Sequence, residues 1–120
     1  MFQTILKSMT EQVPGALGAV LMGYDGIAVD EFFAAENDSE IQLLTVEYAN
    51  VLKEIRKSAE VLEIGEMEEV LIKTDRFVVI LRTLTEEYFC GLILTSDANQ
   101  GKGRYVLLRD MHQLCSSVVS

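Results

Sequence analysis

A single long amphipathic helix is the strongest constraint that this sequence places on its fold. Residues 39–62, SEIQLLTVEYANVLKEIRKSAEVL, carry apolar side chains at spacings of three, four and seven. At about 100° per residue, these spacings place the side chains on one side of a helix. The predicted core stripe consists of Ile41, Leu44, Tyr48, Val51, Leu52, Ile55, Ala59 and Leu62. The rest of the chain must cover a stripe of this length.

The same helix has more apolar surface than its own core needs. Leu43, Val46 and Ala49 lie outside the stripe, all in the first half of the helix. The outer face of the second half is charged, with Lys53, Glu54, Lys57 and Glu60. A half-helix that is apolar nearly all round needs a second covering surface, which in so small a chain is expected from another molecule. This pattern favours an adaptor or a dimer over an enzyme.

The length of the chain predicts a single domain spanning residues 1–120. Its composition, 49% hydrophobic and 24% charged, is that of an ordinary globular protein. No apolar stretch reaches the roughly 18 residues of a membrane span, so no membrane insertion is expected. The first residues contain Glu11 and lack the basic region of a signal peptide, which predicts a cytoplasmic location.

The net charge of −9 is unevenly distributed along the chain. Residues 1–69 hold four basic and fourteen acidic groups, a charge of −10, whereas residues 70–120 hold six basic and five acidic groups, a charge of +1. An acidic surface repels phosphate backbones, which argues against nucleic acid and anionic membranes as partners. The charge suits a basic protein surface, and the alternative that it only maintains solubility stays open.

The remaining pattern predicts an α+β fold. The expected order is helix, strand, strand, long helix, strand, strand, strand, helix. The expected ranges are a helix marked by Phe2 to Val13, strands at 16–22, 27–33, 68–74, 77–81 and 88–94, and a last helix from about Arg104 after a loop at 96–103. Short connections between the last three strands predict an antiparallel meander. The central strands have no polar side, so helices are expected on both faces of the sheet.

Residues that could carry chemistry are scarce. Cys90 and Cys115 lie in apolar runs and are interpreted as small buried hydrophobes. With His112 as the only histidine, a zinc site cannot be assembled from the usual ligands. The segment Gly101-Lys102-Gly103 lacks the rest of a phosphate-binding loop. The sequence therefore predicts no catalytic residue, no metal and no cofactor, and we expect the chain not to be an enzyme.

The predicted strand at 68–74 has a further property. Glu69, Leu71 and Lys73 share one face of it, and Val70 and Ile72 share the other. If this strand forms an edge of the sheet, its outer backbone groups are unpaired and its charges discourage indiscriminate aggregation. A two-fold partner could still pair along that edge. Simple protection of the edge in a monomer is the alternative.

The order of these elements and their residues resembles the roadblock family of dynein light chains and bacterial GTPase regulators. The resembling stretches are ALGAVLMGYDGIAVDEFF, the long helix that follows, and the closing strands FVVILRT and YFCGLILT before a C-terminal helix. The similarity spans almost the entire chain. It implies an α/β/α sandwich with a five-stranded antiparallel sheet, and a homodimer built from residues 39–62 and 67–74.

The resemblance also implies a function. Small bacterial members of the family are associated with Ras-like GTPases and act by repositioning residues of the GTPase, so no catalytic motif carries over. We therefore expect a homodimeric regulator or scaffold of a Ras-like small GTPase, with stimulation of GTP hydrolysis as one form of regulation. A structural light-chain-like subunit and a small-molecule sensor are the alternatives. The predicted dimer or partner interface consists of Leu43, Val46, Glu47, Ala49, Asn50, Lys53, Glu54, Lys57, Glu69, Leu71 and Lys73.

Overall fold

A computed structural model describes residues 2–34 and 39–119, and the side chains of residues 39–42 and 117–119 lie outside that description. The predicted order of elements is confirmed. In chain order they are α1 (Phe2–Gln12), β1 (Ala16–Gly23), β2 (Ala28–Phe33), α2 (Ser39–Leu62), β3 (Glu69–Lys73), β4 (Phe77–Thr83), β5 (Tyr88–Thr95) and α3 (Gln100–Val119).

The strands form one five-stranded antiparallel sheet in the order β2-β1-β5-β4-β3. The N-terminal strand β1 thus pairs with the C-terminal strand β5, which joins the first hairpin to the meander of β3, β4 and β5. The meander is the one that the short connections predict. This order leaves β2 and β3 at the two edges of the sheet.

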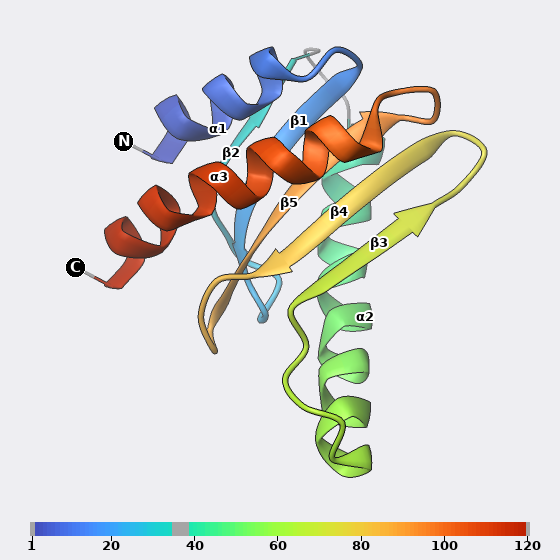
Figure 1. Ribbon diagram of the computed structural model, residues 1–120, viewed down its shortest axis with the longest axis vertical. Coiled ribbons are helices and arrows are strands. Elements are labelled where there is room, and N and C mark those ends of the chain that lie inside the picture. Colours follow the sequence, from blue (N-terminus) through green and yellow to red (C-terminus); the bar gives the residue numbers. More distant parts are fainter. Residues whose placement is uncertain (1, 35–38, 120) are drawn as a thin grey trace.

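Helices α1 and α3 cover one face of the sheet, as Figure 1 shows. Their buried side chains, Leu6, Met9 and Leu107 among them, pack with alternate residues of the strands. Helix α3 approaches the sheet closely at Gly103. A Cβ atom at that position would lie 3.0 Å from Leu94 Cδ1 and 3.2 Å from a second strand side chain. The lack of a side chain at Gly103 therefore sets the height of α3 above β4 and β5.

Among the helices of the described residues, α2 is the one that covers the opposite face, and it lies behind the sheet in Figure 1. The second core forms here, from Leu52 of the helix and the other set of strand residues, with Phe89 as the largest fully buried side chain. Each face of the central strands thus has its own helical cover, which is why those strands show no polar side. The expected α/β/α layering is confirmed.

The core-facing side of α2 differs from the predicted stripe. Thr45, Ala49 and Leu52 are each 1% exposed, so the helix is rotated toward these residues. Val51 and Ile55, which the prediction placed in the core, are exposed. Leu62 is exposed as well, and the Ile41 side chain lies outside the described part. Leu44, Tyr48 and Ala59 keep contact with the core, at its margin or within it.

The last helix begins earlier than predicted. Helix α3 starts at Gln100, four residues before Arg104, because Asn99 caps its first turn. The Asn99 Oδ1 atom accepts a hydrogen bond of 3.0 Å from the Lys102 amide, which satisfies one of the free donors at the helix start. Leu107 and Leu114 are buried as expected, whereas Leu108 is exposed, contrary to the predicted stripe.

Candidate protein-interaction site

The two flanks of α2 differ in what they face. Val46 lies on the flank toward the turn between β1 and β2, because a Cβ atom at Gly26 would lie 3.8 Å from Val46 Cγ1. Arg56 reaches toward the same end of the sheet, over the ring of Tyr24 at 4.6 Å. With Ala49 pointing into the core, the flank opposite Val46 must face the β3 side of the sheet.

This opposite flank is apolar and open. Val51 is 42% exposed, Ile55 36% and Leu62 66%. They follow one another at spacings of four and seven residues, which keeps them in one row along the helix. We call these three residues the α2 apolar flank. Figure 1 shows that the C-terminal half of α2, which carries most of this row, extends beyond the sheet beside the segment that leads to β3.

Strand β3 supplies the second part of the site. It pairs with β4 only, so in the described part of the chain its outer row of backbone groups has no neighbouring strand. Val70 and Ile72 pack toward the α2 side and Leu71 points to the other face, as the alternation predicts. An open edge next to an exposed apolar row is a template for pairing with another chain.

Nine of the eleven predicted interface residues, all but Glu69 and Leu71, fall into three groups. Leu43 is 67% exposed, and Val46, on the turn-facing flank, is exposed too. The polar members of the set are exposed around the outside of α2 and β3: Glu47, Asn50, Lys53, Glu54, Lys57 and Lys73. The assignment of Ala49 to an exposed seam is wrong, because its side chain is buried in the core beneath α2.

Glu69 forms two ion pairs that the sequence did not indicate. Its Oε2 atom lies 2.7 Å from Arg82 Nη1, and its Oε1 atom lies 2.6 Å from Arg104 Nε. Arg82 also donates through Nε to the Met111 sulfur at 3.3 Å. The Glu69 side chain is only 18% exposed, so it ties β3 to β4 and α3. Arg82 and Arg104 lie 13 and 35 positions away, which is why no local pattern revealed this contact.

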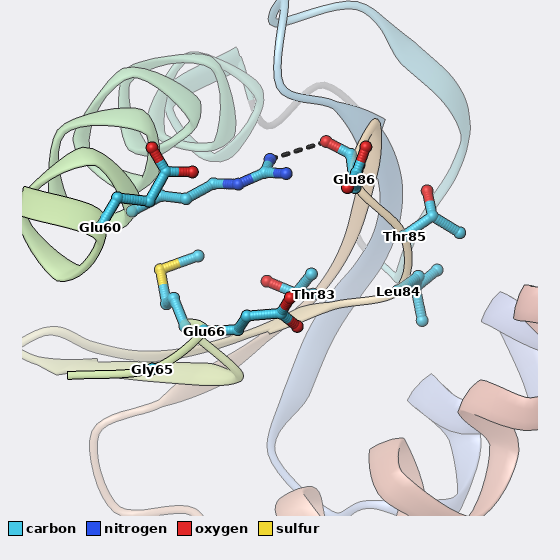
Figure 2. A pocket seen from close by; sticks show the side chains of 9 residues that line it. Glu60, Gly65, Glu66, Thr83, Leu84, Thr85 and Glu86 are labelled. Carbon is cyan, nitrogen blue, oxygen red and sulfur yellow. Dashed lines mark hydrogen bonds between the residues drawn. The ribbon is translucent and has the colours of Figure 1, made fainter. Parts of the chain in front are cut away.

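A cavity of about 350 Å³ lies beside the C-terminal half of α2. Its lining consists of Arg56, Glu60, Gly65, Glu66, Met67, Thr83, Leu84, Thr85 and Glu86. The guanidinium of Arg56 is held here by a hydrogen bond, in which Nη1 donates to the Glu86 carbonyl oxygen at 2.6 Å, and Figure 2 draws this bond as a dashed line ending at Glu86. Three carboxylates and one hydrogen-bonded guanidinium line this space, unlike the mostly apolar walls of a small-molecule pocket. The cavity gives the sensor alternative no support.

Other groups add little chemistry to the described part of the chain. Burial raises the pKa of the Cys90 thiol to about 12, with a smaller contribution from the negative charge of Asp110. Such a thiol is protonated and inert near neutral pH. No cluster of three or more metal-ligating side chains is found among residues 2–34 and 39–119. None of the helices in these ranges is both long and apolar enough for a membrane crossing.

Comparison with known proteins identifies the family. The sequence matches no family model and no curated protein. The crystal structure of MglC from Myxococcus xanthus has 38% sequence identity, covers 97% of this chain and 98% of that one, and superposes with a TM-score of 0.71. An identity of this size over the whole length shows common membership in a family.

Two further structures share the fold. The Roadblock/LC7 domain from Streptomyces avermitilis has a TM-score of 0.86 at 12% identity and covers 98% of both chains. The gliding protein MglB from Thermus thermophilus has a TM-score of 0.82 at 18% identity, covering 94% of this chain and 84% of that one. These two identities show the fold alone. Taken with the identity to MglC, they establish that the chain belongs to the roadblock family of dynein light chains and bacterial small-GTPase regulators.

Proposed function

We propose that this chain is a homodimeric, non-enzymatic regulator or scaffold that binds a Ras-like small GTPase. The observation that carries the proposal is the α2 apolar flank lying beside the open edge of β3. In a single copy the apolar flank is exposed and the outer backbone groups of β3 have no neighbouring strand among the described residues. A two-fold axis along the β3 edge would bring each surface against the same surface of a second copy. The membership in the roadblock family supports the same arrangement.

The energetics favour a second copy as the cover of this surface. Complete burial of a Val, Leu or Ile side chain contributes roughly 1.5–3 kcal/mol. Val51, Ile55 and Leu62 of two copies would therefore contribute several kcal/mol, in addition to the hydrogen bonds of the paired β3 edges. Leu43 and Val46, on the other side of the helix, remain free in such a dimer. We assign these two residues to the surface that meets the GTPase.

The dimer is tested by sedimentation velocity on the full chain. The Val51→Asp/Ile55→Asp double variant should sediment as a monomer, since two carboxylates would be buried without partners in the seam. Both residues are exposed in a single copy, so the helical circular dichroism should remain. The Leu43→Asp/Val46→Asp variant is the matched control on the other flank and should sediment as a dimer. A dimer mass retained by the first variant would remove the assignment of this seam.

Binding of a GTPase is tested by capture on the immobilised dimer. Lysate of the source cell is applied with a non-hydrolysable GTP analogue or with GDP, and retained proteins are identified by mass spectrometry. A Ras-like protein retained with one nucleotide only supports a regulator. The same protein should be lost from the Leu43→Asp/Val46→Asp variant. Retention of no Ras-like protein with either nucleotide would contradict the proposal.

The runner-up function is a structural subunit of a larger assembly, which would use the same surfaces without an effect on GTP hydrolysis. Nucleotide dependence separates the two. A GTPase that binds equally with GTP analogue and GDP, and whose hydrolysis rate is unchanged by the dimer, indicates a scaffold. A changed rate indicates a regulator.

A further inference from the structure

The sheet face that carries α1 and α3 is incompletely covered. Helix α3 lies over β4 and β5, because Gly103 abuts Leu94 and Ile80. Leu71 of β3 pairs across the sheet with Ile80 and is therefore the next side chain outward on this face. Figure 1 shows β3 running clear of α3 on this side. The face of β3 next to α3 thus has no helical cover within the described residues.

Two apolar side chains border this uncovered area. Leu71 is 38% exposed on β3, and Leu108 is 49% exposed on α3. The ion pair between Arg104 and Glu69 joins their two elements. Leu71 lies two residues from Glu69 on the same strand face, and Leu108 lies one helical turn from Arg104. The four residues therefore form one surface, which we call the α3–β3 surface.

This surface is basic in an otherwise acidic protein. Lys73 continues the β3 face beyond Leu71, and Arg104, with its side chain 57% exposed, borders the α3 side. The carboxylate of Glu69 is already shared between two arginines. Helix α3 carries three basic residues and one acidic residue, and that acid, Asp110, is paired with Arg109. In the turn after β3, Asp75 and Arg76 offset each other in charge.

We propose that the α3–β3 surface binds an acidic amphipathic segment of another protein. Leu71 and Leu108 offer contacts to apolar side chains of the segment, and Lys73 and Arg104 offer partners to its carboxylates. Opposite charges at the rim steer the segment and fix its orientation, whereas the buried apolar contacts supply affinity. The strand β3 spans about 17 Å, which matches roughly three turns of a helix.

This surface is separate from the proposed dimer seam. The seam uses the β3 backbone edge and α2, on the other face of the sheet. Binding of a segment at the α3–β3 surface therefore does not require the dimer. Loss of one property leaves the other measurable, so the two proposals can fail independently.

The test uses the full chain labelled with ¹⁵N and a synthetic 15-residue peptide with capped ends. The peptide carries Leu at every third or fourth position and Glu at most others, and the control peptide replaces each Glu by Lys. The acidic peptide should shift the amide resonances of Leu71, Lys73, Arg104 and Leu108 in a saturable manner. Its affinity should fall several-fold when salt is raised, because the rim contacts are exposed charges.

Variants locate the binding site. Leu108→Asp should weaken the acidic peptide at least tenfold, and Lys73→Glu should weaken it several-fold. Val61→Asp is the matched control, because Val61 is 74% exposed on α2, the helix on the opposite face of the sheet. That variant should bind as the unchanged protein does.

Four outcomes would overturn the proposal. These are no saturable binding, shifts centred on other residues, equal binding of the Lys peptide, and tighter binding of a single-stranded oligonucleotide than of the acidic peptide. The last outcome would indicate a phosphate-binding surface instead of a protein-binding one.

Discussion

At the scale of single residues, Arg56 joins the second half of α2 to the rest of the molecule. Its guanidinium stacks over the Tyr24 ring at 4.6 Å and donates to the Glu86 carbonyl oxygen at 2.6 Å. The Tyr24 hydroxyl is in turn 2.7 Å from the Thr83 hydroxyl oxygen. One side chain thus connects α2 with the β1–β2 and β4–β5 turns. No local sequence pattern indicated these contacts, because the partners of Arg56 lie 30 or more positions away.

Replacing Arg56 by Ala should reduce the free energy of unfolding by about 1 kcal/mol, since a cation–π contact and a hydrogen bond at a partly exposed site each contribute about that much or less. Urea unfolding followed by circular dichroism measures the change. Lys57→Ala is the control, because Lys57 is an exposed neighbour on the same helix. Equal losses for the two variants would mean that the contacts of Arg56 contribute nothing to stability.

The thiol of Cys90 provides a prediction about pH. Burial raises its pKa from 9.0 to about 12 in the folded protein. The unfolded chain therefore loses this proton at lower pH than the folded chain does. The contribution of Cys90 is fully present below pH 9 and is lost as pH rises toward 12, by at most about 1.4 kcal/mol per pH unit. Urea unfolding at a series of pH values from about 8 to about 10.5, which spans the ordinary thiol pKa, should show a steeper loss in the natural protein than in Cys90→Ala.

At the scale of secondary-structure elements, the sequence predicted the existence and order of all eight elements but misjudged how α2 faces its core. The apolar pattern of α2 allows two orientations. Val51, Ile55 and Leu62 form one row along the helix, and Ala49 and Leu52 lie in another. The packing against the sheet selects the second. The spacing of apolar residues does not distinguish those that contact the core from those that could contact a second copy. In a helix with excess apolar surface, the spacing therefore does not determine which face packs against the sheet.

Helix α3 shows a different limit of sequence reasoning. Gly101 and Gly103 are typical of a loop, so the sequence predicts a loop over this segment. In the structure both lie in the first turn and a half of the helix, which Asn99 caps. Gly103 is needed for the close approach to Leu94, a tertiary contact that local propensity cannot anticipate.

The two glycines of α3 should respond oppositely to the same substitution. Gly103→Val inserts a branched side chain where a Cβ atom already lies 3.0 Å from Leu94 Cδ1, and overpacking of this kind costs about 1–3 kcal/mol. At Gly101 a Cβ atom would lie 3.4 Å from Asn99 Oδ1, an ordinary contact. The Gly101→Val substitution should therefore be neutral or stabilising, because glycine weakens a helix. Thermal unfolding of both variants measures the difference, and an equal melting temperature would show that α3 moves freely to accommodate a side chain.

At the scale of the whole molecule, the two faces of the sheet carry different open surfaces, and the charge is unevenly distributed along the chain. Residues 1–69, with a charge of −10, build α1, β1, β2 and α2, whereas residues 70–120, with a charge of +1, build β4, β5 and α3. The sequence itself shows this uneven charge, and its conditional expectation that the strand at 68–74 forms an edge of the sheet is met. The sequence could not predict the ion pairs of Glu69 on the α3 face, because Arg82 and Arg104 come close to Glu69 only in the folded protein.

The proposed dimer should protect one region of the molecule and leave the rest unchanged. Amide hydrogen exchange at residues 51–62 and 69–73 should be slower in the natural protein than in Val51→Asp/Ile55→Asp, because the outer amides of β3 would donate to the second copy. Exchange in α3 should be the same in both, since this helix lies on the opposite face and away from the seam. A slowing that extends evenly over all elements would instead indicate that the substitutions destabilise the monomer. Protection confined to β2, the other edge strand, would indicate that the copies pair along the opposite side of the sheet.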